Sequence, residues 1–299
     1  MPSNVNDQVY LDQLFTSALR NRNMVKVADA GNLYVKLRMR EYPFCRVILP
    51  PTPITQADCQ RSLTNDTLSV IKDIAPEAEA VSLTFRGKPD HRYITGSRYE
   101  IGIHKISSLM YTKEEAELMA YEAPITTLIE EDIVKVMQKE EDAHFIQQCE
   151  DIVSRPNGKS IELKTASGKI DKSALTFLTN ALDGDELETA CFLMAKTTWN
   201  DWAAQGSEVF DIGAWDVAKN GYKEGTILGR KCVVTMKEDL VPNNVVWAFA
   251  SPEYLGHMFT LGDAKFWVDS EAEQIFMKGW EYIGMGFGNT KALAKLTIK

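Results

Sequence analysis

The stretch PITTLIEEDIVKVMQKEEDAHFIQQCEDI, residues 124–152, decides most of what the sequence predicts about the fold. Its apolar side chains recur every three or four residues, which is the spacing of one face of an α-helix. Pro124 suits a first turn, and Arg155-Pro156-Asn157-Gly158 is a stop signal. At ~1.5 Å per residue the helix would be about 40 Å long, which is long for a compact enzyme domain. The apolar stripe comprises Ile125, Leu128, Ile129, Ile133, Val136 and Met137, continued more loosely by Ala143, Ile146 and Cys149.

The other face of this helix is crowded with acids, and we predict that it faces solvent. These acids are Glu130, Glu131, Asp132, Glu140, Glu141 and Asp142. The cluster at 140–142 could bind a cation, but a solvated face is the commoner use of acids at helical spacing. His144 could be poised by nearby carboxylates, and we interpret it as an ordinary surface or interface histidine.

Charge is distributed unevenly along the chain. Residues 20–46 carry a net charge of +5, whereas residues 112–151 carry −9. Because a basic extended segment and a long acidic helix are complementary, we hypothesise that the segment lies along such a helix, in its own subunit or in a neighbour's. Two separately solvated faces are the alternative. The basic residues are Arg20, Arg22, Lys26, Lys36, Arg38, Arg40 and Arg46.

The first fifty residues have the pattern of an arm. A short amphipathic helix is predicted over 7–20, and residues 34–40 alternate basic and apolar side chains, as a strand does. Residues 49–53 are too rich in proline for a helix or a central strand.

Residues 79–106 are predicted to form a long hairpin. Its arms are residues 80–86 and 92–103, and residues 87–90 have the composition of a turn. The apolar content is too low for a buried sheet, and an isolated half-polar hairpin is only marginally stable in water. The hairpin is therefore expected to rest on another surface.

The rest of the chain, from residue 160 onward, alternates helices and strands and indicates a mixed α+β fold. Candidate helices cover 172–182 and 196–204, and candidate strands cover 189–195, 226–234, 245–250 and 292–298. Trp199 and Trp202 could stack on a ligand, but packing in the core or at an interface is the commoner use of tryptophan.

No stretch of the sequence carries a recognisable catalytic motif. Gly158-Lys159-Ser160 lacks the earlier glycine and the preceding strand of a phosphate-binding loop, so we interpret it as a turn. The stretch Gly284–Gly288 lacks the spacing and following elements of a dinucleotide fingerprint, and we interpret it as a tight backbone crossing before the last strand. The four histidines show no metal-ligand spacing. We therefore predict no catalytic, cofactor or metal site.

The composition argues against several further classes of protein. The 299 residues are 44% hydrophobic, with a net charge of −9 and a pI near 5.1. An acidic protein is a poor candidate for sequence-specific DNA binding, although it can enclose DNA without gripping it. Five widely spaced cysteines indicate reduced thiols. We expect neither a signal peptide nor a membrane-spanning segment.

The order of these features resembles the major capsid proteins of tailed bacteriophages, which have the Hong Kong 97 phage-type fold. That order is a basic arm, a long polar hairpin, a long acidic helix and a mixed α+β domain, and it spans nearly the whole chain. No single motif is diagnostic. The supporting stretches are 76–81, 96–101, 105–106, 111–113, 117–118, 140–146, 227–229, 247–249 and 288–293.

The resemblance implies a division of labour along the chain. Residues 1–50 would be the N-terminal arm, and residues 79–106 the extended E-loop that lies on an adjacent subunit. The peripheral domain would comprise 107–158, with the spine helix, and 257–283, returning as a long strand. The axial domain would comprise 159–256 and 284–299. Implied inter-subunit contacts are Phe85, Arg86, Lys88, Tyr93, Arg98 and Tyr99 in the hairpin and Lys36, Arg38, Arg40 and Arg46 in the arm.

The resemblance also implies partners. The chain would assemble with itself as hexamers and pentamers into an icosahedral head that encloses double-stranded DNA, in the virion and after assembly in the host cytoplasm. Many relatives begin with a scaffolding-like region, but here only a short helix precedes the arm. A separate scaffolding protein or a processed chain is therefore expected, with a portal and possibly a decoration protein. An encapsulin-like nanocompartment shell and an acidic α+β enzyme are the alternatives.

Overall fold

The computed structural model describes most of the chain beyond the arm. The described residues are 43–61, 67–74, 82–83, 85, 87–88, 96–114, 125–165, 168–204 and 225–299, with the side chains of 125–131 and 225 left out. The helix predicted at 7–20 and the strand predicted at 34–40 lie outside these residues.

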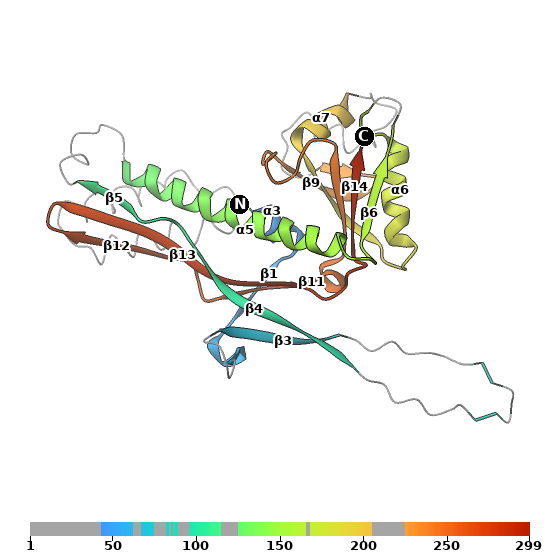
Figure 1. Ribbon diagram of the computed structural model, residues 1–299, viewed down its shortest axis with the longest axis horizontal. Helices are drawn as coiled ribbons and strands as arrows, with labels where there is room; N and C mark the ends of the chain where they lie inside the picture. The colour runs from blue at the N-terminus through green and yellow to red at the C-terminus, as the bar shows by residue number, and fades with distance from the viewer. Residues whose placement is uncertain are drawn as a thin grey trace.

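Two β-sheets organise the described residues (Figure 1). One has the order β1-β11-β13-β4-β3-β2, with β12 and β5 also paired to β13. The long strand β13 is thus the axis around which this sheet is built. Its strands are β1 (Pro51–Ile54), β2 (Gln60–Arg61), β3 (Leu68–Ile74), β4 (Ser97–Ser107), β5 (Tyr111–Glu114), β11 (Gly256–Leu261), β12 (Lys265–Glu271) and β13 (Gln274–Phe287).

The other sheet has the order β6-β14-β10-β7-β9-β8. Its central strand β10 has the sequence VVWAFA and is buried at every position, as expected of a strand covered on both faces. The predicted strands at 189–195, 245–250 and 292–298 are confirmed, and the one at 226–234 is divided by a turn at Leu228-Gly229. The strands are β6 (Lys159–Leu163), β7 (Thr189–Ala195), β8 (Gly225–Ile227), β9 (Arg230–Thr235), β10 (Val245–Ala250) and β14 (Leu293–Ile298).

Helices cover this six-stranded sheet on both faces. Helices α6 (Lys172–Asp183) and α7 (Lys196–Ala203) share one core cluster with Val246 and Ala248 of β10. On the opposite face, Trp247 and Phe249 join a cluster that includes the C-terminal half of α5 (Ile125–Val153). Trp199 and Trp202 are fully buried in the first cluster, which confirms that they are core residues.

Helix α5 lies alongside β13 and extends from the six-stranded sheet toward the β12–β13 hairpin (Figure 1). Its contact with β13 is close at Gly279, where a Cβ atom would lie 2.6 Å from Cγ2 of Ile133. The helix predicted at 124–152 is therefore confirmed almost to the residue. One position of its predicted apolar stripe is wrong, because the side chain of Val136 is largely exposed.

Three predicted boundaries differ in the structure. Residues 44–49, expected at the end of an extended arm, include the short helix α3 (Phe44–Ile48), which contacts α5 and whose Phe44, Cys45 and Ile48 side chains are buried. The partner of β4 is β3, so the hairpin begins near residue 68 and not at 79. Residues 257–283 hold β11, β12 and most of β13, because turns after Leu261 and after Glu271 interrupt the expected long strand.

The prolines of residues 49–53 occupy a place that fits their chemistry. Pro51 and Pro53 lie in β1, which pairs in parallel with β11 and is the last strand of its sheet. A proline has no N–H to donate to a neighbouring strand, so an edge position tolerates it. The prediction that this segment is no central strand is confirmed.

Candidate functional site

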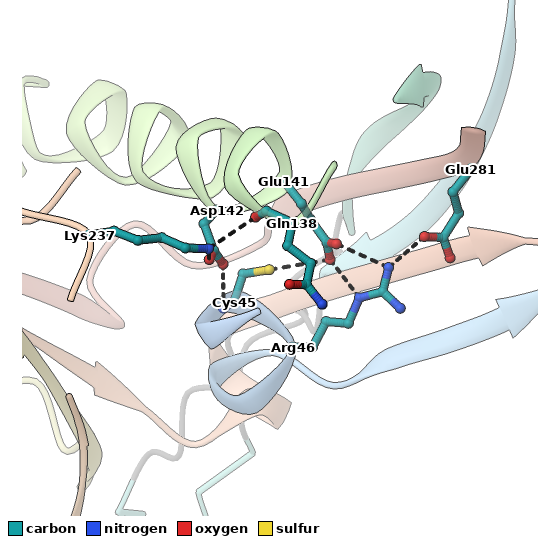
Figure 2. A network of polar contacts seen from close by, with 7 residues as sticks. All are labelled: Cys45, Arg46, Gln138, Glu141, Asp142, Lys237 and Glu281. Atoms are coloured by element: carbon teal, nitrogen blue, oxygen red, sulfur yellow. Dashed lines mark hydrogen bonds and ion pairs between the residues drawn. The ribbon is translucent and has the colours of Figure 1, made fainter. Parts of the chain in front are cut away.

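A buried network of charges joins α3, α5, β13 and the segment after β9 (Figure 2). Nε of Arg46 lies 2.7 Å from Oε1 of Glu141, and Nη2 of Arg46 lies 2.7 Å from Oε2 of Glu281. On the other side of α3, Lys237 donates to Asp142. The backbone N–H of Cys45 donates to Oδ1 of Asp142 over 3.0 Å. Residues almost one hundred positions apart are thus fixed to one another.

Glu141 and Asp142 have no exposed surface, so the prediction that they belong to a solvated helix face is wrong. The physical reason is their position on the helix. Glu141 continues the row of Ile133, Met137 and Phe145, and this row faces the core. The helical periodicity indicates that Glu141 is buried, but the prediction followed the usual preference of acidic residues for solvent. Asp132, Lys139 and Glu140 do lie on the exposed face, and the side chains of Glu130 and Glu131 lie outside the described residues.

Burial dominates the electrostatics of the network. Desolvation raises the pKa of Glu141 despite the nearby charge of Arg46, and it raises the pKa of Asp142 despite Lys237. Burial by itself would lower the pKa of Arg46, but the charges of Glu141 and Glu281 raise it above its ordinary value. The Cys45 thiol, which donates to Oε1 of Glu141, has its pKa raised by burial and by both acids. These groups hold α3, α5, β13 and the segment after β9 together.

Arg46 therefore plays a part that differs from the predicted one. It was expected to contact a neighbouring subunit, but it is 9% exposed and is bound between two glutamates of its own chain. Of the basic arm residues, Arg46 contacts the acidic helix within the chain, while Lys36, Arg38 and Arg40 lie outside the described residues. Lys237 and Glu281 were not recognisable as members of this network, since no local pattern connects them to α5, whereas Arg46 belongs to the basic segment that was expected to lie along an acidic helix.

The hairpin differs from the buried network, because its described residues between 82 and 88 are exposed. Strand β3 pairs with β4 from Leu68↔Ile103 to Ile74↔Ser97. Every described residue between 82 and 88 is exposed, and Phe85 has a relative exposure of 106%. Among the predicted contact residues, Lys88 is exposed and Arg98 pairs with Asp73 at the surface. Arg86 and Tyr93 lie outside the described residues, and the inter-subunit contacts predicted for this region stay predictions.

The base of the hairpin is packed tightly against β13. Ile101 of β4 lies over Gly286, where a Cβ atom would be 2.7 Å from Cγ1 of Ile101. Tyr99 covers Gly288 in the same way, because a Cβ atom there would lie 3.0 Å from the Tyr99 hydroxyl. The glycine-rich stretch 284–288 thus covers the end of β13, at Phe287, and the residue after it, where neighbouring strands approach closely: a Cβ atom at Gly256 would lie 2.3 Å from the Gly286 carbonyl oxygen.

The remaining candidate motifs have structural uses. Gly158 precedes β6, and Nζ of Lys159 donates to the carbonyls of Ala181 and Lys291 while pairing with Asp185 at 2.6 Å. Hydrogen bonds from Lys159 and Lys291 lower the pKa of Asp185. The predicted turn lies at 154–157, just before this stretch, and Lys159 and Ser160 are the first residues of β6.

Three observations bear on binding chemistry. Within the described residues, no group of three His, Cys, Asp or Glu side chains is arranged to hold a metal ion. No described helix is long and apolar enough to cross a membrane. All five cysteines are free thiols, as the sequence suggested.

Comparison with known proteins identifies the fold. No protein family model and no curated protein matches the sequence. Solved structures do match it. The capsid of cyanophage P-SCSP1u is 13% identical with a TM-score of 0.59, over 77% of this chain and 83% of that chain. The capsid of an empty GTA particle is 14% identical with a TM-score of 0.60, over 86% of this chain and 90% of that one.

A third similar structure is the virus-like particle from Pyrococcus furiosus, which is 16% identical with a TM-score of 0.56. The match covers 89% of this chain and 98% of that chain. Further matches include a mycobacteriophage, Adephagia, with a TM-score of 0.59 at 11% identity. The chain has the α+β fold of tailed-phage capsid proteins, as its sequence suggested.

Proposed function

We propose that this chain, which has the fold of phage capsid proteins, is the major capsid protein of a tailed bacteriophage and builds a shell instead of catalysing a reaction. It would assemble as pentamers and hexamers into an icosahedral head around double-stranded DNA. The carrying observation is the hairpin continued from β3 and β4, whose described residues from 82 to 88 are all exposed. A long exposed hairpin is marginally stable alone, so a surface of another subunit is its natural support.

The proposed division into domains follows the two sheets. The six-stranded sheet, drawn from 159–256 and 284–299, would be the axial domain around the five- and six-fold axes. The eight-stranded sheet with α5 would supply the peripheral domain and, through β3 and β4, the E-loop. Residues before 43 would be the arm that reaches a neighbour. A separate scaffolding protein, a portal and possibly a decoration protein would complete the assembly in the host cytoplasm.

An encapsulin-like compartment is the second candidate. It is favoured by the match to the Pyrococcus furiosus virus-like particle, which covers 98% of that chain. The two candidates differ in what the shell encloses, so the contents of particles purified from the native source distinguish them. Nuclease-protected double-stranded DNA supports the phage head, and a protein cargo without DNA supports the compartment.

The hairpin hypothesis is tested by Phe85→Ala. Because Phe85 is fully exposed within the chain, its removal should leave the thermal unfolding of the unassembled subunit unchanged. If it fills a site on a neighbour, the yield of megadalton particles in velocity sedimentation should fall at least several-fold. Phe85→Leu, which keeps an apolar side chain, is the matched control and should retain most of the assembly. An F85A chain that assembles as well as the parent contradicts this role for the hairpin.

A further inference from the structure

Two histidine rings join the hairpin strand to the long helix. His104 lies on β4 and His144 on α5, with ring centroids 4.4 Å apart and ring planes inclined by 38°. Both side chains are half-buried. Since β4 pairs with β3 on one side and with β13 on the other, this contact lies where the hairpin meets the body of the protein.

The neighbours of His144 favour an unprotonated Nδ1 atom on its ring. The Gln148 amide nitrogen donates to the Met285 carbonyl over 3.2 Å, which fixes the orientation of the amide. The same nitrogen lies 3.4 Å from Nδ1 of His144, so Nδ1 must be the acceptor in this weak contact. A proton on Nδ1 would face another donor. Turning the amide over would only bring its oxygen against the Met285 carbonyl.

His104 is equally ill placed to carry a charge. It has a hydrogen bond with the backbone of Gly102, and its Nε2 atom is buried without a hydrogen-bond partner among the described residues. Protonation of Nε2 would therefore create a buried donor with no acceptor, beside a second imidazole. Such a donor is costly to leave unsatisfied.

The charged groups around the pair do not reverse this preference. Burial lowers the pKa of His104, and His144 lowers it further. Burial lowers the pKa of His144, and Glu140 on the same helix only partly opposes this. On β13, Ile283 is the residue paired with His104, and Glu281 nearby is engaged by Arg46. Lys105, the next residue on β4, lies over the ring of Trp280.

We propose that His104 and His144 form a pH-sensitive joint. Both rings are neutral at pH 7, and their protonation in acid loosens the contact between the hairpin strand β4 and helix α5. This pH-sensitive joint does not depend on what a shell would enclose, and it requires only the folded chain. It would let acidification free the hairpin base from α5 while the six-stranded sheet stays closed.

The direction of the effect follows from linkage. A histidine whose pKa is lower in the closed contact than in the open one binds protons more readily when the contact opens. The contact is therefore fully stable above the ordinary histidine pKa of about 6.5 and weakens as the pH falls below it. Two protonated rings at this separation would also repel each other.

Hydrogen exchange of the full chain, read by mass spectrometry and corrected for intrinsic rates, tests the joint. Between pH 7.5 and pH 5.0, exchange of peptides from β4 and from the C-terminal half of α5 should rise several-fold, because the open contact binds protons more readily than the closed one. Peptides from β10 and β14 should not change. No selective rise in β4 and α5 overturns the proposal.

Variants assign the effect to the two rings. His104→Phe and His144→Phe keep an aromatic ring but cannot be protonated, so each should reduce the acid-induced rise to within about twofold. His257→Phe is the matched control, since its ring contacts Tyr99 and Phe259 instead, and it should behave as the parent. Glu140→Gln, an exposed change that should not affect folding, removes a charge that favours the protonated His144 ring, so its acid-induced rise should be at least as large as that of the parent. An unaltered rise in the phenylalanine variants, or a smaller rise in E140Q than in the parent, contradicts the joint.

Discussion

Two arginine–carboxylate pairs of equal length lie in contrasting regions. Nε of Arg46 is 2.7 Å from Glu141, and Nε of Arg98 is 2.7 Å from Asp73. The first pair is 9% and 0% exposed and joins α3 to α5, whereas the second is 72% and 75% exposed near the hairpin. Solvent screens the second pair and not the first, so two pairs of equal length should contribute unequally to the free energy of unfolding. The buried network is thus fixed by contacts within the chain, while the described residues of the hairpin between 82 and 88 are exposed.

The largest difference should appear on removing the two arginines in turn. Arg46→Met leaves Glu141 and Glu281 buried without their cation, so we expect a loss of about 3–5 kcal/mol in the free energy of unfolding. Denaturant unfolding of the full chain measures this. A loss below about 1 kcal/mol would show that water or rearrangement satisfies both acids, and the contrast between the regions would then disappear.

A change where the two regions meet should have an intermediate effect. Gly286→Ala places a Cβ atom 2.7 Å from Ile101, at the base of the hairpin. Overpacking of this kind costs about 1–3 kcal/mol. Ile101→Ala removes the Cγ1 and Cδ1 atoms nearest to the new Cβ, so the double variant should lose less stability than the sum of the two single variants. Equal stability of G286A and the parent would mean that β4 and β13 can separate without cost.

The smallest effect is expected at the exposed pair. Arg98→Ala should change the free energy of unfolding by no more than about 1 kcal/mol, because both partners are largely solvated. Measured under the same conditions as R46M, it is the matched control for a pair of the same length. If Arg98 contributes instead to a contact with a neighbour, the variant should reduce the yield of particles without altering the stability of the subunit.

These contrasts also explain what the sequence could and could not predict. The periodicity of 124–152 and the apolar run of β10 are local signals, and both predicted their elements correctly. Glu141 was wrongly predicted to face solvent, although its helical spacing from Ile133 and Met137 is that of the buried row, and its partners Arg46 and Glu281 are 95 and 140 positions away. Strand β3 was not predicted, since its place is set by pairing with β4 and not by its own short pattern.

The central claim is that the hairpin is stabilised by a second copy of this chain within a closed shell. Electron cryo-microscopy of the fast-sedimenting fraction, produced with a scaffolding protein supplied, tests it most directly. The account predicts shells built of five- and six-fold capsomers in which the side chain of Phe85 is buried against an adjacent subunit. A chain that stays a monomer or dimer under these conditions, or a shell in which Phe85 remains exposed to solvent, contradicts it.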